Sequence, residues 1–258
     1  MKIVVLLKMV PDVVEELEVG SDGKSLEADF LRMILNERDA HALEEGLLLK
    51  ERHGGTLTVV APEAPEVDNA LYTALAKGAD RAVKIPLSPL PSSRAVAALL
   101  GKVLPTVPDL LPADLILTGC QAIDDLDGMT APLLAHAWEL PYLGLVTNIS
   151  VNADDKTACV TKEYSGGTHG EFDVRLPAVL GVQSAQQPPR YVPVAKVRAA
   201  MKTQKIETVE MQDGTAVPSV EILTMAKPEA AGHAEMLEGP PEQVAEKIAQ
   251  VLAAHGVM

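Results

Sequence analysis

The chain has 258 residues, a length that suits one large domain or one domain with an appendage. Hydrophobic residues make up 47% of it, which excludes intrinsic disorder for most of the chain, while a net charge of −14 argues against a nucleic-acid partner. Aromatic residues make up only 3%. The core must therefore be aliphatic, which suits the doubly buried strands of a parallel sheet.

Two cysteines, Cys120 and Cys159, are too few for a disulfide framework or a metal centre. The apolar run within residues 1–8 is too short for a signal peptide. No apolar run reaches the ~18 residues that a membrane span requires. We therefore expect a soluble, cytoplasmic-type protein without direct membrane insertion.

Strands and helices are expected to alternate over the first 140 residues. The expected strands are 3–7, 56–60, 82–85 and 113–118, and the expected helices are 36–53, 67–77, 92–104 and 127–140. Asn36 or Asp39 is expected to cap the first helix, and glycines end the first two. This alternation predicts βαβ units, and hence an α/β fold with a parallel sheet.

The pattern changes after residue 140. Strand-like segments at 145–151, 158–163 and 171–175, with a turn at Gly166-Gly167, predict an added β-hairpin, and 177–182 reads as another buried strand. A final amphipathic helix is expected over 241–255. The stretch 206–240 before it has little capacity for a core of its own. We therefore expect an α/β domain over residues 1–205 and an extended C-terminal arm over 206–258 that packs on a partner.

The segment 117–130 reads as a strand, a polar loop and the start of a helix. Ligands of open α/β sheets bind outside the carboxyl ends of the strands, where a helix N-terminus presents N–H groups to a phosphate. Thr130 would add a hydroxyl donor. The negative charges of the three aspartates would repel a phosphate. We therefore expect their side chains to point away from it, to accept hydrogen bonds from backbone N–H groups or to bind ribose hydroxyls. An ordinary βα connection is the alternative.

Residues 119–125, Gly-Cys-Gln-Ala-Ile-Asp-Asp, resemble the nucleotide loop of electron-transfer flavoprotein beta subunits. Further landmarks of that family follow in order along nearly the whole chain: Lys8, Asn36–Asp39 with Glu44-Glu45, residues 73–82, 162–167 and 176–179, Pro189-Arg190-Tyr191, and residues 234–239. The resemblance implies a flavodoxin-like domain of the adenine-nucleotide-hydrolase type that binds AMP structurally.

The resemblance also implies which residues hold the nucleotide. They are Leu6; Asn36, Glu37, Arg38 and Asp39; Ala61 and Pro62; and Gly119, Cys120, Gln121, Ala122, Ile123, Asp124, Asp125, Leu126, Asp127, Gly128, Met129 and Thr130. Redox chemistry would belong to an FAD held mainly by the alpha subunit. A recognition loop over 189–205 would dock dehydrogenases through Val194, with Lys196 and Arg198 steering an acidic partner.

The implied function is that of a heterodimeric electron carrier, itself not an enzyme. It would accept electrons from flavin dehydrogenases of the acyl-CoA or amine type and pass them to a membrane-bound quinone oxidoreductase. One alternative is a bifurcating subunit that binds a second FAD and oxidises NADH, but its loop typically reads Asp-Gly-Asp-Thr-Ala-Gln, unlike residues 124–130. The other alternative is a stand-alone nucleotide-binding protein of the stress-protein type. The C-terminal arm argues against it, because a monomer would leave the arm exposed.

Several residues depart from the family or suggest other chemistry. Val13 stands where the family often has an aromatic residue near the flavin, and Cys120 replaces a residue that is often basic. We expect Cys120 to pack as a small residue rather than to act as a nucleophile. His41 and Glu44-Glu45 are more typical of a solvated helix face than of a metal site, so no metal is expected.

Overall fold

The computed structural model describes residues 1–29, 31–86, 92–152, 154–209, 220–228, 234 and 236–257. It comprises two compact units, residues 1–224 and 225–258, which are described separately. The boundary expected at residue 205 lies inside the first unit. Beyond it the short strand β11 (Ile206–Thr208) pairs in parallel with β5 (Arg81–Ile85), so the sheet extends past that point.

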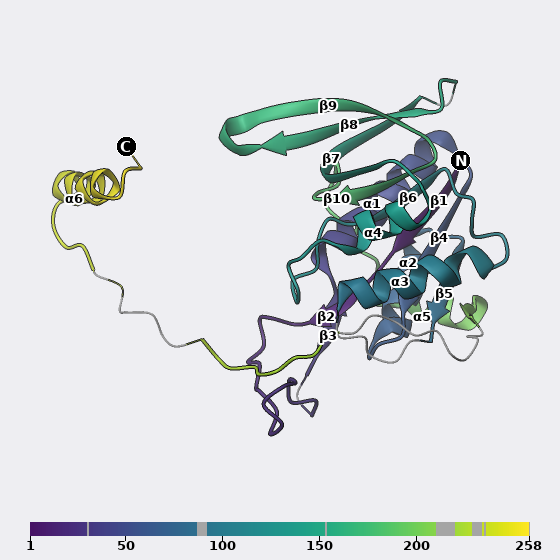
Figure 1. Cartoon of the computed structure of the whole chain (residues 1–258), viewed down its shortest axis with the longest axis horizontal. Helices are drawn as coiled ribbons and strands as arrows, with labels where there is room; N and C mark the ends of the chain where they lie inside the picture. Colours follow the sequence, from purple (N-terminus) through teal and green to yellow (C-terminus); the bar gives the residue numbers. More distant parts are fainter. Residues whose placement is uncertain are drawn as a thin grey trace. The chain divides into compact units, whose positions relative to one another are not determined.

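The first unit is built on a nine-stranded sheet in the order β11-β5-β4-β1-β6-β10-β7-β8-β9. Strands from β11 to β7 run parallel, and β8 and β9 add an antiparallel hairpin at one end (Figure 1). The remaining strands of this sheet are β1 (Lys2–Leu6), β4 (Thr56–Pro62), β6 (Leu115–Gly119), β7 (Tyr142–Asn152), β8 (Thr157–Tyr164), β9 (Thr168–Arg175) and β10 (Ala178–Val182). The expected α/β fold with an added hairpin is confirmed.

Helices cover both faces of the sheet, and β1 shows why its residues are all aliphatic. Ile3 and Val5 pack into the cluster that contains α1 (Glu37–His53) and α2 (Val67–Lys77). Val4 and Leu6 pack into the cluster on the other face, with α3 (Ser93–Val103) and α4 (Thr130–Ala137). A strand buried on both faces has no solvent-facing position for a polar residue. A separate antiparallel pair, β2 (Met9–Pro11) and β3 (Met33–Leu35), follows β1.

Helix α4 is shorter than the helix expected over 127–140. The residues before Thr130 form a turn in which Asp127 Oδ1 accepts a hydrogen bond of 3.0 Å from the Met129 N–H. Leu126 has a φ of 54°, outside the helical region. At the other end Glu139 has a φ of 55°, which stops the helix. Side-chain bonding to nearby backbone therefore competes with helix formation here.

The segment expected as a recognition loop over 189–205 is mostly a helix, α5 (Val194–Thr203). In the sequence, the apolar residues of this segment alternate with proline and basic residues, which indicated an exposed loop. In the structure Val197 and Ala200, three residues apart, lie on one buried face of the helix. Val194 at the start of the helix is 60% exposed. The helix forms because its buried face packs on the same domain, close to α2.

The second unit contains the expected final helix, α6 (Pro241–Ala254). None of its residues, all of which the structure describes, is buried. Glu235 of the landmark at 234–239, and residues 210–219 and 229–233 of the expected extended stretch, lie outside the described residues. No helix in the described ranges is both long and apolar enough to cross a membrane.

Candidate functional site

A cavity lies at the carboxyl edge of the parallel strands, where β1, β4 and β6 end beside each other. Of the residues expected at a nucleotide, it is lined by Leu6, Asn36, Asp39, Pro62, Gly119, Cys120, Gln121, Ala122, Asp125, Asp127, Gly128 and Thr130. The other expected residues are not among its lining residues: Glu37, Arg38, Ala61, Ile123, Asp124, Leu126 and Met129. The structure thus brings four separate parts of the chain to one cavity.

Asp39 joins three elements at this edge. Its Oδ1 accepts a hydrogen bond of 2.6 Å from the Gly119 N–H, and its Oδ2 accepts one of 2.9 Å from the Lys8 N–H. The side chain therefore ties the start of α1 to the ends of β1 and β6. Burial raises the pKa of Asp39 to about 6, because the surroundings disfavour the charged form.

The raised pKa of Asp39 predicts a pH-dependent stability. The folded state binds this proton more tightly than the unfolded state, so Asp39 stabilises the fold most below about pH 4, and this contribution is lost as the pH rises through about 6. The free energy of unfolding of the wild type, measured in urea relative to that of Asp39→Asn, should therefore fall by on the order of 2–3 kcal/mol from pH 4 to pH 7. Parallel pH profiles for the two proteins would contradict this expectation.

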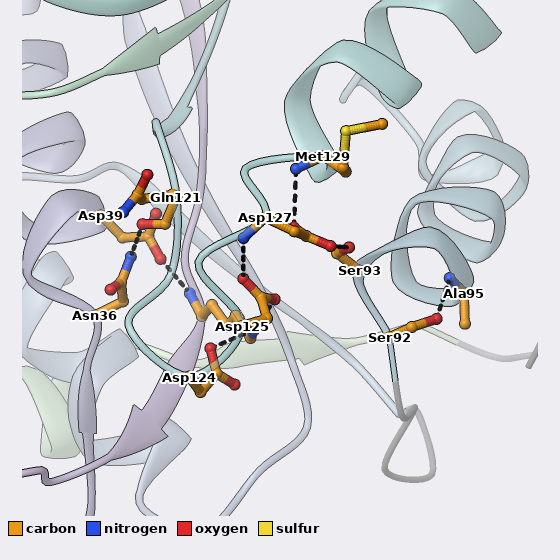
Figure 2. A network of polar contacts seen from close by, with 11 residues as sticks. Asn36, Asp39, Ser92, Ser93, Ala95, Gln121, Asp124, Asp125, Asp127 and Met129 are labelled. Carbon is orange, nitrogen blue, oxygen red and sulfur yellow. Dashed lines mark hydrogen bonds and ion pairs between the residues drawn. The ribbon is translucent and has the colours of Figure 1, made fainter. Parts of the chain in front are cut away.

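The expectation that Asn36 or Asp39 caps α1 is confirmed for the position of Asn36 but not for a side-chain hydrogen bond. Asn36 stands at the N-cap position, but its side chain makes no capping hydrogen bond. Its Nδ2 instead donates a hydrogen bond of 3.1 Å to the carbonyl oxygen of Gln121 (Figure 2). Asp39 lies within the first turn and bonds to strand ends. Both side chains therefore fasten the helix to the cavity loop, residues 119–130, rather than to itself.

Two of the three aspartates of the cavity loop accept hydrogen bonds from backbone N–H groups, one of the arrangements that the sequence leaves open, and both also line the cavity. Asp125 Oδ1 accepts from the Asp127 N–H at 3.3 Å, and Asp127 Oδ1 accepts from the Met129 N–H at 3.0 Å. Lys8 supplies the remaining partner: its Nζ lies 2.7 Å from Asp124 Oδ1 and 2.8 Å from Asp125 Oδ2. This ion pair holds the loop against the end of β1.

Four polar lining residues were not expected from the sequence: Lys8, Glu63, Ser93 and Thr118. Ser92 caps α3 by accepting from the Ala95 N–H at 3.2 Å, and the next side chain, Ser93 Oγ, contacts Asp127 Oδ2. A helix that follows a parallel strand in a right-handed crossover starts at the carboxyl edge of the sheet. The serine pair at the start of the predicted helix 92–104 was therefore the signal that could have placed Ser93 at the cavity.

The cavity is suited to binding rather than to acid–base or nucleophilic catalysis. Leu6, Val96 and Leu100 give it apolar walls. Cys120 is buried, and this burial raises the pKa of its thiol, as expected for a packed residue. Asp124 and Asp125 are both bound to Lys8. The apolar walls fit a flat heterocycle, with polar groups at the rim to orient it.

A second polar cluster overturns the expectation of a solvated face at His41 and Glu44-Glu45. Glu44 and Glu45 are 2% and 1% exposed. Arg190 donates to Glu44 from its Nε at 2.8 Å and from its backbone N–H at 2.9 Å. Glu45 accepts from the Gln186 N–H at 3.0 Å. The carboxylates are buried because the distant segment 183–190 runs along this face of α1.

Fold and cavity together define an open α/β protein of the class that binds ligands at the carboxyl edge of its sheet. The electron transfer flavoprotein domain matches residues 28–214. Electron transfer flavoprotein subunit beta of Methylophilus methylotrophus is 31% identical over 262 residues, covering 98% of both chains. The subunit beta of Bacillus subtilis is 28% identical, over 98% of this chain and 97% of the relative. The chain belongs to the electron transfer flavoprotein family, as the cavity loop predicts.

Proposed function

We propose that this chain is the beta subunit of a heterodimeric electron carrier and that its cavity binds AMP as a structural ligand. The observation that carries the proposal is the cavity at the ends of β1, β4 and β6, bordered by the loop 119–130, in a chain of this family. FAD, held mainly by the alpha subunit, supplies the redox chemistry. Electrons pass from flavin dehydrogenases of the acyl-CoA or amine type to a membrane-bound quinone oxidoreductase.

The cavity walls support a nucleoside better than they support its phosphate. Leu6, Val96 and Leu100 offer an apolar surface to the adenine ring. The lining residues Asp125 and Asp127 carry carboxylates, which accept hydrogen bonds and so suit the ribose hydroxyls. For the phosphate, the hydroxyl of Thr130 and the N–H groups at the start of α4 are the available donors. The residues present therefore fit AMP, with most of the contact at its nucleoside half.

Replacing Thr130 by valine is expected to lower AMP retention about tenfold, because one hydrogen bond to a charged group is lost. The measurement is the AMP content of the purified heterodimer after dialysis, by extraction and chromatography. Thr106→Val, outside the cavity, is the matched control, since the Thr106 hydroxyl donates a hydrogen bond of 2.8 Å to the Val103 carbonyl oxygen. Stoichiometric AMP in the Thr130→Val heterodimer would remove Thr130 from the phosphate site.

The same extraction separates the proposed carrier from a bifurcating complex. One FAD and one AMP per heterodimer are expected for the carrier. Two FAD would indicate the bifurcating alternative, in which the cavity holds a second flavin. A chain that binds nucleotide but no alpha subunit on co-expression would instead indicate the stand-alone nucleotide-binding protein.

Helix α5 is the proposed docking segment for dehydrogenases. Val194 is 60% exposed, and Lys196 and Arg198 are exposed beside it. An exposed apolar side chain among cations suits transient docking to an acidic partner. The C-terminal arm, residues 206–258, is proposed to pack on the alpha subunit through the apolar side of α6, where Ile248 and Val251 are 45% and 51% exposed.

Val194→Ala is expected to raise the apparent KM for the dehydrogenase several-fold while leaving the melting temperature and the flavin and AMP contents unchanged. Val197→Ala is the matched control on the same helix, because Val197 is 8% exposed. Truncating this buried valine should lower stability by ~1–3 kcal/mol. Normal kinetics with a lower melting temperature in Val194→Ala would assign Val194 to the core instead.

A further inference from the structure

The cavity loop, residues 119–130, carries three aspartates and no lysine or arginine. Asp125 and Asp127 line the cavity, and Asp124 directly precedes them in the chain. A phosphate that binds at Thr130 and the start of α4 therefore lies on the same loop as these carboxylates, and like charges repel. Positive charge from another part of the chain would offset this repulsion.

Lys8, two residues after the end of β1, supplies such a charge. Among the described lining residues it is the only lysine or arginine. Its Nζ lies 2.7 Å from Asp124 Oδ1 and 2.8 Å from Asp125 Oδ2 (Figure 2). Burial alone would lower the pKa of Lys8, but the hydrogen bonds to the two aspartates raise it above its ordinary value. The side chain is therefore a cation at neutral pH that two carboxylates of the loop share.

The backbone of Lys8 is fixed independently of its ammonium group. Its N–H donates a hydrogen bond of 2.9 Å to Asp39 Oδ2, and its carbonyl oxygen accepts one of 2.9 Å from the Asn36 N–H. The cavity loop is also fastened without the ammonium, since the carbonyl oxygen of Gln121 accepts a hydrogen bond of 3.1 Å from Asn36 Nδ2. Removing the ammonium therefore changes the charge beside the loop while these backbone contacts remain.

We propose that Lys8 determines which ligands the cavity accepts, because its ammonium offsets the charge of Asp124 and Asp125 and so allows a nucleotide, not only a neutral nucleoside, to bind. This inference rests on the proposed nucleotide-binding function and deepens it. One ammonium beside two carboxylates leaves a local net charge of −1, and its loss would leave −2. The phosphate is sensitive to this difference, whereas the uncharged base and ribose are not.

The test is titration calorimetry of the full-length chain, freed of co-purified nucleotide, with AMP and with adenosine. Lys8→Met keeps an unbranched side chain and removes its charge. The affinity for AMP should fall about tenfold, while the affinity for adenosine changes less than about twofold. Lys50→Met is the matched control, because Lys50 Nζ forms a similar ion pair, 2.6 Å from Asp80 Oδ1, and Lys50 is not a lining residue of the cavity. Both affinities should stay unchanged in this control.

Two rescue variants separate the charge of Lys8 from the shape of its ion pair. Lys8→Arg keeps a cation, so its affinity for AMP should stay within about threefold of wild type. Lys8→Met combined with Asp124→Asn restores the local net charge of −1 without restoring the ion pair, so most of the lost AMP affinity should return. The difference between wild type and Lys8→Met should also shrink in about 0.5 M sodium chloride, because salt screens the charges.

Three results would overturn the role of Lys8 and leave the proposed function standing: wild-type AMP affinity in Lys8→Met, equal losses of AMP and adenosine affinity, or no recovery with Asp124→Asn. If Lys8→Met does not fold, Asp124→Asn in the otherwise wild-type chain tests the same charge. It should raise the affinity for AMP relative to adenosine about threefold, and an unchanged ratio overturns the inference. Wild type that binds neither ligand overturns the inference together with the proposed function.

Discussion

Gly119→Ala is expected to lower the free energy of unfolding by about 3 kcal/mol, because the end of β6 approaches α1 too closely for a side chain. A Cβ at this position would lie 2.5 Å from Asp39 Oδ1 and 2.8 Å from the backbone carbonyl carbon of Arg38. The backbone cannot move aside as a flexible side chain would. Relief requires α1 to shift, which also breaks the 2.6 Å hydrogen bond from the Gly119 N–H to Asp39.

Urea unfolding followed by circular dichroism measures this effect, and Gly101→Ala on α3 is the matched control. A Cβ at residue 101 would meet its nearest neighbour, the Ala137 Cβ, at 3.4 Å, an ordinary contact. Alanine also favours a helix over glycine, so Gly101→Ala should raise stability by about 0.5 kcal/mol. A Gly119→Ala protein as stable as wild type would show that α1 and β6 are not in such close contact.

Arg190→Leu is expected to cost about 3–5 kcal/mol of stability, because it leaves the Glu44 carboxylate buried without its cation. Glu44 is 2% exposed and receives hydrogen bonds from the Arg190 Nε and backbone N–H. The loss should be seen in the same urea experiment. It should also loosen the segment that leads into α5, so limited proteolysis near residue 190 should speed up.

Two further variants show whether the buried charge is the cause. Arg32→Leu removes an arginine that is 66% exposed and lies 3.8 Å from Asp12, so its effect should stay within about 0.5 kcal/mol. The double variant Glu44→Gln with Arg190→Leu should be more stable than Arg190→Leu alone, since position 44 then holds no buried charge without its cation. Equal losses for Arg190→Leu and Arg32→Leu would mean that the Glu44–Arg190 pair contributes little.

The strand and helix pattern was largely predictable because its signals are local. Segments 56–60, 67–77 and 82–85 are runs of aliphatic residues or helical stripes bounded by glycine, and each corresponds to β4, α2 or β5 within a residue or two. The wrong predictions concern segments where a side chain competes for backbone hydrogen bonds, or where tertiary packing overrides the local sequence pattern. The turn at Asp127 shortened α4, and contact of Val197 with the domain turned an expected loop into α5.

The sequence by itself determined the fold class, the carboxyl-edge position of the cavity loop and the family, since these follow from local periodicity and from motifs read in order. Only the tertiary structure decided which side chains meet. Asp39 turns inward to Gly119, Lys8 reaches the loop 116 residues away, and Glu44 pairs with Arg190 across 146 residues. Such contacts depend on how elements distant in the chain pack together, and no local pattern encodes which face of a helix a remote segment will cover.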